Sequence, residues 1–503
     1  MRIALRIPLP LMFAVVLFLV VGELASGTNV YFVSMMAIAV VSACVTYNFL
    51  GGFRTISGIA FTSFALGSLV ISQIGKVVLF ERADENLDVP QVTITVYAVY
   101  FASLMLGTFV FSRLRFPLPR PAEPETPTQS KYLYFVSLTG GLIGSAGEMA
   151  MDLAQGSQST SLTHAYARAL AYLLPFSLVL AVDNRIRSTN GRHCFGWLAL
   201  WPTLAIMVEG FVISSRLSFL EPVGIVFLTC YLRSFTFRKS HRVAGIVAVT
   251  FFFVILSPYY LYSRGWRGDG TIRGQASTML NVLESAPDQW ASIKAIVGNA
   301  ALETPGTVNY FATPGAVTVN RFAKIGPDST LINACATGFH YGFTSIGLDL
   351  ATQVPRFLYP NKPEFGSNPY LGHLDGQESD TFETTNSTVT SVADSYGAFS
   401  WFGAVVFPFV VMPLVFVVNE SMFDITRPWG TVAVVLLILG ISEGSMGADV
   451  VVSMIKNPLY VIIISWCAMW VVRIIPAMGD RAVRLRTGDT EAVSTDALGP
   501  SIV

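Results

Sequence analysis

The stretch VYFVSMMAIAVVSACVTYNFL, residues 30–50, decides the fold, because it is a membrane-length apolar run without a single charged residue. At about 1.5 Å per helical residue, roughly 20 such residues cross the hydrocarbon core of a bilayer. Similar runs lie on both sides of it. The predicted spans are 9–26, 30–50, 56–80, 93–112, 132–152, 166–182, 195–214, 217–233, 243–262, 397–419, 429–446 and 450–474. The sequence therefore predicts an all-α polytopic membrane protein with about twelve transmembrane helices.

The composition supports this class. Apolar residues make up 52% of the chain, charged residues only 13%, and the mean hydropathy is +0.57. Soluble domains carry about 25% charged residues. Lys plus Arg equals Asp plus Glu at 32 each, so the net charge indicates no nucleic-acid partner. The five cysteines show no metal-ligand spacing, and we predict neither a metal nor a cofactor.

The distribution of positive charge predicts the orientation. With the N-terminus inside, nineteen of the 32 Lys and Arg residues fall in the inner connections and the C-terminal tail. Short outer connections such as 81–88 carry little positive charge, as the positive-inside rule requires. The first apolar run lacks a small-x-small cleavage site, so we expect it to be retained as a span. Both termini are predicted to be cytoplasmic.

The spans divide the chain into four parts. Residues 1–262 hold nine predicted spans, 263–396 form one large outward-facing loop, 397–474 hold the last three spans, and 475–503 form a cytoplasmic tail. Charged groups inside lipid are costly, so a polar and aromatic insert between spans is where chemistry is expected. Apolar spacing predicts helices at 276–304 and 338–351 within this loop, which we expect to fold as a cap.

Arginines at the outer ends of spans are the first candidate site residues. Arg216 lies in a very short outer turn between two predicted spans, and Arg264 and Arg267 follow the ninth span. These side chains fit either interfacial anchors or ligands of a diphosphate, which a guanidinium binds in a bidentate manner. The second reading draws support from their position on the face that the positive-inside rule depletes of positive charge.

Three motifs in order resemble a known family. An apolar helix opened by SerSerArg (214–233), the loop segment VPRFLYPNKP (354–363) and SVADSYGAFSWFG (391–403) are similar to the O-antigen and exopolysaccharide repeat-unit polymerases of the Wzy type. The resemblance covers about 205–420 by motif. That family usually carries a glutamate before its Tyr-x-x-Phe-Gly motif, whereas here Asp394 precedes Tyr396.

The resemblance implies a membrane glycosyltransferase on the outer face of the bacterial cytoplasmic membrane. It would transfer a growing glycan from its polyprenyl diphosphate carrier to a sugar hydroxyl of a second lipid-linked repeat unit. Membrane lipids, a chain-length regulator and a flippase are the implied partners, without nucleic acid. The assigned residues are Arg216, Arg264, Arg267, Arg356 and Lys362 for the diphosphates, Asp394 and His340 for the base, and Tyr359 and Tyr396 for sugar.

Plainer interpretations stand beside these roles. A histidine between aromatic residues, such as His340, is often a packed core residue, and Arg356 and Lys362 fit anchors to lipid phosphate. Other functions also remain open. A ligase would use the same carrier with a different acceptor, a polyprenyl-phosphate-sugar transferase would carry acidic residues in its first outer loop, and a flippase would line a central pathway with charge.

Overall fold

The structure, a computed structural model, is helical in every regular element that it describes. It describes residues 7–122, 124, 127–155, 162–213, 216–239, 310–312, 323–353, 389–442 and 461–474, with isolated positions at 243, 245–247, 250, 277, 281, 284, 359 and 459. Within these described residues, four helices are long and apolar enough to cross a membrane. They are Val30–Arg54, Ile56–Leu79, Pro90–Phe111 and Ser391–Met422. The chain is therefore a helical, membrane-embedded protein.

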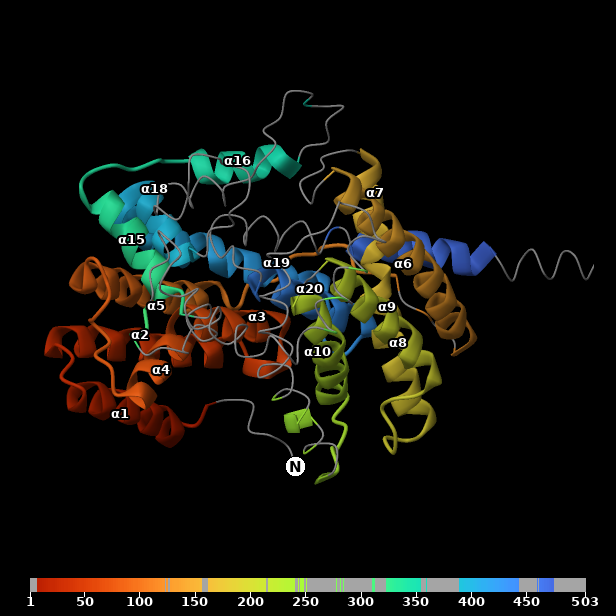
Figure 1. Cartoon of the computed structure of the whole chain (residues 1–503), viewed down its shortest axis with the longest axis horizontal. Coiled ribbons are helices and arrows are strands. Elements are labelled where there is room, and N and C mark those ends of the chain that lie inside the picture. The colour runs from red at the N-terminus through yellow and green to blue at the C-terminus, as the bar shows by residue number, and fades with distance from the viewer. Residues whose placement is uncertain are drawn as a thin grey trace, which may run out of the picture.

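The N-terminal part forms one packed group of helices (Figure 1). Its elements are α1 (Leu9–Ala25), α2 (Val30–Phe49), α3 (Ile56–Ala65), a π-helical turn at Leu66–Val70, α4 (Ile71–Leu79) and α5 (Pro90–Phe111). α2 packs along α5, and α1 contacts both α2 and α4. Buried aromatic rings of α3 and α5, among them Phe61, Phe64 and Phe101, form much of this core.

The middle part follows the predicted order with one break. It contains α6 (Pro127–Gln155), α7 (Leu162–Ala171), α8 (Leu173–Ser188), α9 (Trp197–Ile213) and α10 (Arg216–Leu232). The predicted span at 166–182 is divided between α7 and α8 at Tyr172. α6 packs closely on both, because a Cβ on Gly141 or Gly144 would lie 2.5 Å or less from their backbone atoms.

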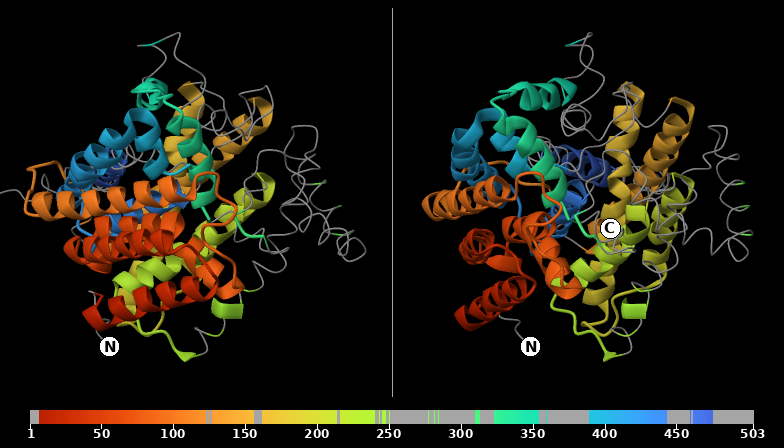
Figure 2. Two further views of the ribbon diagram at one scale, coloured as in Figure 1. Left: turned by 90° about the vertical axis from the view of Figure 1, so that its left-hand side faces the viewer. Right: turned by 60° about the vertical axis from the view of Figure 1, so that its left-hand side comes forward.

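The C-terminal part supplies the helices that concern the site. They are α15 (Ile325–Ala336), α16 (Thr344–Gln353), α18 (Ser391–Val406), a π-helical turn at Phe407–Val411, α19 (Met412–Met422), α20 (Pro428–Ser442) and a last helix at Val461–Ile474. α18 contacts both α5 and α15, and Figures 1 and 2 show α15 beside α18 at one edge of the molecule.

Helix limits in the predicted outer loop differ from the sequence expectation. α16 begins at Thr344 rather than near 338, because Gly338 and Gly342 take positive φ angles of 101° and 60° that no helix accommodates. α15 was not predicted. α18 begins at Ser391, before the expected start of its span at 397, because the Thr390 hydroxyl accepts a hydrogen bond from Val392 N and caps the helix. The predicted helix at 276–304, the span at 243–262 and the tail fall almost entirely outside the described residues.

Candidate functional site

The most unusual backbone among the candidate residues lies inside α18. Phe399 (φ −138°, ψ 22°) and Ser400 (φ 58°, ψ −145°) are not helical, so the helix is broken between a first segment at 391–398 and the longer segment that follows. Ser400 occupies a region that glycine normally takes. A break removes the intrahelical partners of the preceding carbonyl groups, and buried carbonyls need replacements.

The turn between α15 and α16 provides those replacements. Tyr341 N donates to Gly397 O at 3.3 Å, and Gly342 N donates to Ala398 O at 3.0 Å. The approach depends on Gly397, since a Cβ there would lie 2.6 Å from the Tyr341 ring. The first segment of α18 and the 340–343 turn are therefore one structural unit, although about 55 residues separate them in the sequence.

This unit brings the two predicted base residues to the same place. The Asp394 side chain is buried in the first turn of α18, and its Oδ1 accepts a hydrogen bond of 2.7 Å from the Tyr341 hydroxyl. The same hydroxyl lies 2.9 Å from Asp394 O. His340 is the preceding residue of the turn and is exposed. The carboxyl and the imidazole therefore flank one tyrosine.

The contacts of His340 define its tautomer. Its Nδ1 lies 3.3 Å from Gly397 O, and a carbonyl oxygen only accepts, so the hydrogen is on Nδ1. In the neutral ring this leaves Nε2 as the basic nitrogen. The imidazole also packs edge to face on Tyr396, with ring centroids 6.2 Å apart. The imidazole is therefore held by its Nδ1 and by the Tyr396 ring while it remains exposed.

The aromatic residues of the site divide into covered and open rings. Tyr396, a predicted sugar-binding residue, is only 5% exposed and packs between His340 and Trp401. Trp401 is 41% and Phe343 71% exposed, and Phe343 packs on Phe399 at the break. At this junction, therefore, Trp401 and Phe343 are exposed, whereas Tyr396 is covered.

A second buried carboxyl, that of Asp328, joins the helices around the site. Asp328 on α15 is completely buried and accepts from the Tyr97 hydroxyl of α5, from Thr390 N at 2.7 Å and from the Thr390 hydroxyl. Burial raises the pKa of Asp328 to about 6, although these hydrogen bonds act in the opposite direction. Nearby, Tyr100 and Ser391 hydroxyls are 2.9 Å apart. α5, α15 and the start of α18 are thus joined by polar contacts.

The side chains of the predicted cationic residues lie outside the residues that the structure describes. Arg216 opens α10 as expected, but its side chain lies outside the described residues, as do Arg264, Arg267, Arg356 and Lys362. Tyr359 is described and is 42% exposed. The structure therefore places His340, Asp394 and Tyr396 together and leaves the diphosphate assignments as predictions.

Two residues of the site were not foreseen from the sequence. Tyr341 and Asp328 acquire their importance from partners 53 and 62 residues away along the chain.

The described part of the chain contains no group of three or more His, Cys, Asp or Glu residues arranged to hold a metal ion. Comparisons with protein-family models, curated proteins and solved structures find no match to this chain.

Proposed function

We propose that this protein is a membrane glycosyltransferase that polymerises polyprenyl-diphosphate-linked oligosaccharide repeat units into O-antigen or exopolysaccharide. The observation that carries the proposal is the junction of His340, Tyr341 and Asp394 at the broken start of α18. An exposed base there lies where the outer insert meets a membrane helix. A lipid-linked substrate presents its sugar at the same level, just outside the bilayer.

The proposed topology has twelve transmembrane helices, an outward loop and cytoplasmic termini in a bacterial cytoplasmic membrane. Contacts between distant segments support it by falling into two sets. Loops expected outside contact each other, as when Asn86 donates to Tyr310 O. Loops expected inside do the same: Ser57 on α3 contacts Glu420, and Arg233 contacts Asp183.

The reaction requires no redox step. The acceptor hydroxyl oxygen forms a bond to the anomeric carbon of the donor, while the bond from that carbon to the diphosphate oxygen breaks. The electron pair leaves with the polyprenyl diphosphate, and the hydroxyl proton passes to a base. In this proposal Arg216, Arg264, Arg267, Arg356 and Lys362 stabilise the departing negative charge.

His340 and Asp394 divide the work of the base. His340 Nε2 takes the proton, because the imidazole is exposed and its Nδ1 faces a carbonyl. Asp394 is only 4% exposed and its Oδ1 accepts from the Tyr341 hydroxyl, so it positions the turn that carries His340. Trp401 and Tyr359 present open rings to the sugars, with Tyr396 packing behind.

Complementation of a polymerase-deficient strain tests the proposal. Wild type is expected to restore long glycan chains, whereas His340→Ala and Asp394→Asn leave single capped repeat units at equal protein level. Arg216→Ala and Arg356→Ala test the diphosphate assignment in the same assay. His193→Ala, which removes an exposed histidine between α8 and α9, is the matched control and should retain long chains. Long chains in all four site variants would contradict the assignment. Carrier-linked polymer accumulating in a deletion strain would identify a ligase.

A further inference from the structure

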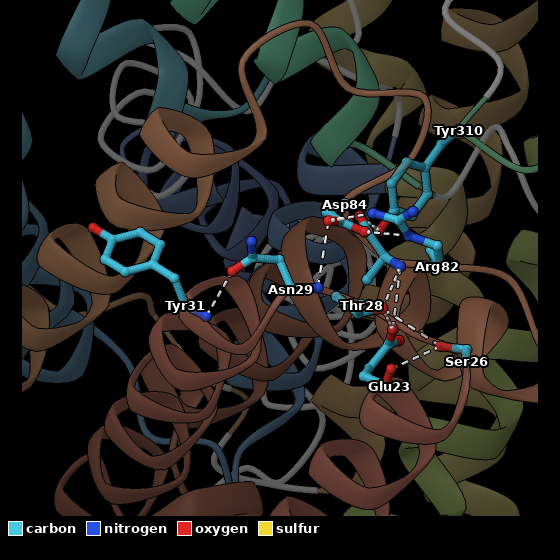
Figure 3. A network of polar contacts seen from close by, with 9 residues as sticks. Glu23, Ser26, Thr28, Asn29, Tyr31, Arg82, Asp84 and Tyr310 are labelled. Atoms are coloured by element: carbon cyan, nitrogen blue, oxygen red, sulfur yellow. Dashed lines mark hydrogen bonds and ion pairs between the residues drawn. The ribbon is translucent and has the colours of Figure 1, made fainter.

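A second buried polar cluster lies at the outer end of the N-terminal helices, away from the proposed site. We name the Glu23 cluster by its members Glu23 on α1, Ser72, Gln73 and Lys76 on α4, and Tyr310. Figure 3 shows how Glu23, Thr28 and Tyr310 converge there. Glu23 is completely buried. Its Oε2 accepts from Thr28 Oγ1 at 2.7 Å and from Ala83 N at 3.1 Å.

The neighbouring charges already have partners. Lys76 Nζ lies 3.0 Å from Glu81 Oε2 and 4.5 Å from the centre of the Tyr310 ring. Arg82 pairs with Asp84 at 2.9 Å. Although burial raises the pKa of Asp84, hydrogen bonds from Arg82 and Asn29 N outweigh it, and that pKa lies below its ordinary value. Three carboxylates thus face two cations, and Glu23 is the carboxylate without a dedicated cation.

Tyr310 closes the cluster from the outside. Its ring is fully buried, its hydroxyl donates to Ala83 O at 2.9 Å, and Asn86 donates to its backbone oxygen. Burial, reinforced by the Glu23 charge, raises the pKa of Tyr310 well above its ordinary value, so the ring remains a neutral phenol. Phe311 lies directly against Gly75, where a Cβ would be 2.5 Å from its ring.

Several polar atoms inside the cluster lack hydrogen-bond partners among the described residues. They are Glu23 Oε1, Gln73 Oε1 and Ser72 Oγ, and all three residues are 0% exposed. Gln73 lies beside the Tyr310 hydroxyl. The same face of α4 meets α1, because Val77, one turn after Gln73, fills the space beside Gly22. Glu23 and Gln73 therefore share one interface.

A buried carboxylate with a bare oxygen is costly in membrane surroundings and needs a compensating positive charge. We propose that the Glu23 cluster is a binding site for one unit of positive charge, a proton or a sodium ion, held between Glu23 Oε1 and Gln73 Oε1. As an acid, Glu23 would donate to the Gln73 amide oxygen. A sodium ion would take the same two oxygens and Ser72 Oγ, which are ligands that hard cations prefer.

The site affects the docking of the outer insert, because Tyr310 and Phe311, which belong to the insert, cover the site. Filling the site removes the uncompensated charge beneath Tyr310 and strengthens the docking of this segment on α1 and α4. The charged or titratable groups facing Glu23 are Lys76 from α4, Asp84 from the loop after α4, and Tyr310, while Glu81 pairs with Lys76 and acts on Tyr310. The inference is independent of the proposed glycosyl transfer.

Thermal unfolding of the purified full-length protein tests the site. In one series sodium replaces choline at constant ionic strength, and in the other the pH falls from about 8 to about 6. A sodium site predicts that sodium raises the wild-type midpoint by roughly 2–4 °C, and a proton site predicts a similar rise on acidification. Glu23→Gln should abolish the response, because the amide is neutral. Gln73→Leu should weaken it.

Glu85→Gln is the matched control, since it removes the same charge from an exposed position in the loop after α4 and should keep the wild-type response. Asp328 contributes a pH dependence common to all these variants, so the difference between wild type and Glu23→Gln is the quantity to compare. Sodium and pH responses in Glu23→Gln identical to those of wild type would overturn the proposal.

Discussion

Asp328 shows how a single buried carboxyl joins three helices. It lies on α15, accepts from Tyr97 on α5, and accepts from both the backbone and side chain of Thr390, which caps α18. Its burial is complete, and its pKa is raised to about 6 from an ordinary value of 3.8. The folded protein therefore binds this proton more tightly than the unfolded chain does.

Asp328→Asn should flatten the pH dependence of stability. Below about pH 4 the carboxyl is protonated in both the folded and the unfolded protein, so folding buries no charge. Above its folded pKa, the buried charge lowers the free energy of unfolding by roughly 3 kcal/mol. Wild-type stability from this group therefore falls as the pH rises from about 4 through about 6. Denaturation midpoints across this range, compared between the two proteins, provide the measurement.

Asp328→Leu is the control that separates charge from hydrogen bonding. It leaves Thr390 N and the Tyr97 hydroxyl without their acceptor, each at a cost of about 1–3 kcal/mol, so it should destabilise at every pH. Equal pH dependence in wild type and Asp328→Asn would show that another group is responsible.

At the residue scale, the family resemblance selected His340, Asp394 and Tyr396 as candidates, and the structure places all three at one junction. Tyr341 could not be selected, because its role depends on a carboxyl 53 residues away. The burial of Tyr396 and the break at Ser400 also arise from packing between distant segments, which local composition does not encode.

At the element scale, α18 keeps a broken helix where a continuous one would satisfy its own backbone. The break persists because the 340–343 turn supplies donors to Gly397 O and Ala398 O. A close contact on the other side of the break also requires glycine, since a Cβ on Gly403 would lie 1.9 Å from Ser395 O. Helix geometry and loop geometry are therefore mutually dependent here.

Substitutions of Ser400 should measure the strain of this break. Its φ of 58° and ψ of −145° suit glycine, and such strain costs a non-glycine residue about 1–3 kcal/mol. Ser400→Gly is expected to be neutral or to stabilise by up to about 1 kcal/mol, after the entropy of glycine is deducted. Ser400→Val should destabilise by at least about 2 kcal/mol, because a β-branched side chain fits this conformation poorly. Thermal unfolding measures both.

Ser34→Val, on the exposed face of α2, is the matched control and should change stability by less than about 1 kcal/mol. A strong loss of stability in Ser400→Gly would mean that the serine hydroxyl, rather than the backbone, maintains the break.

The observed helix limits agree with the predicted ones where the apolar run alone determines them. α2 was predicted at 30–50 and lies at Val30–Phe49, and α3 to α4 match the span predicted at 56–80. The prediction was less accurate where a cap or a glycine decides, as at Thr390 for α18 and Gly342 for α16. α15 was missed, because its contacts with α5 and α18 rather than a sequence period bury it.

At the scale of the whole molecule, polar contacts gather at two opposite ends of the helices. One end joins the loop after α4 to Tyr310 and α15, as shown by the bond from Val89 N to Ser329 Oγ. The other joins Arg233 to Asp183 and to Thr426 O. Among the described residues, no long-range polar contact joins one end to the other, which is the pattern of a protein that crosses one membrane repeatedly.

Cysteine labelling should reveal this division directly. In a variant without the five native cysteines, Asp88→Cys and Thr337→Cys should react from outside intact cells with a membrane-impermeant maleimide, because both positions are exposed at the first end. Ser188→Cys and Thr426→Cys are also exposed but lie at the second end, so they should react only after permeabilisation. The positive-inside distribution predicts which end is outside. Labelling of Asp88→Cys and Thr426→Cys from the same side would contradict the alternating topology, and with it the placement of His340 toward a substrate on the outer face.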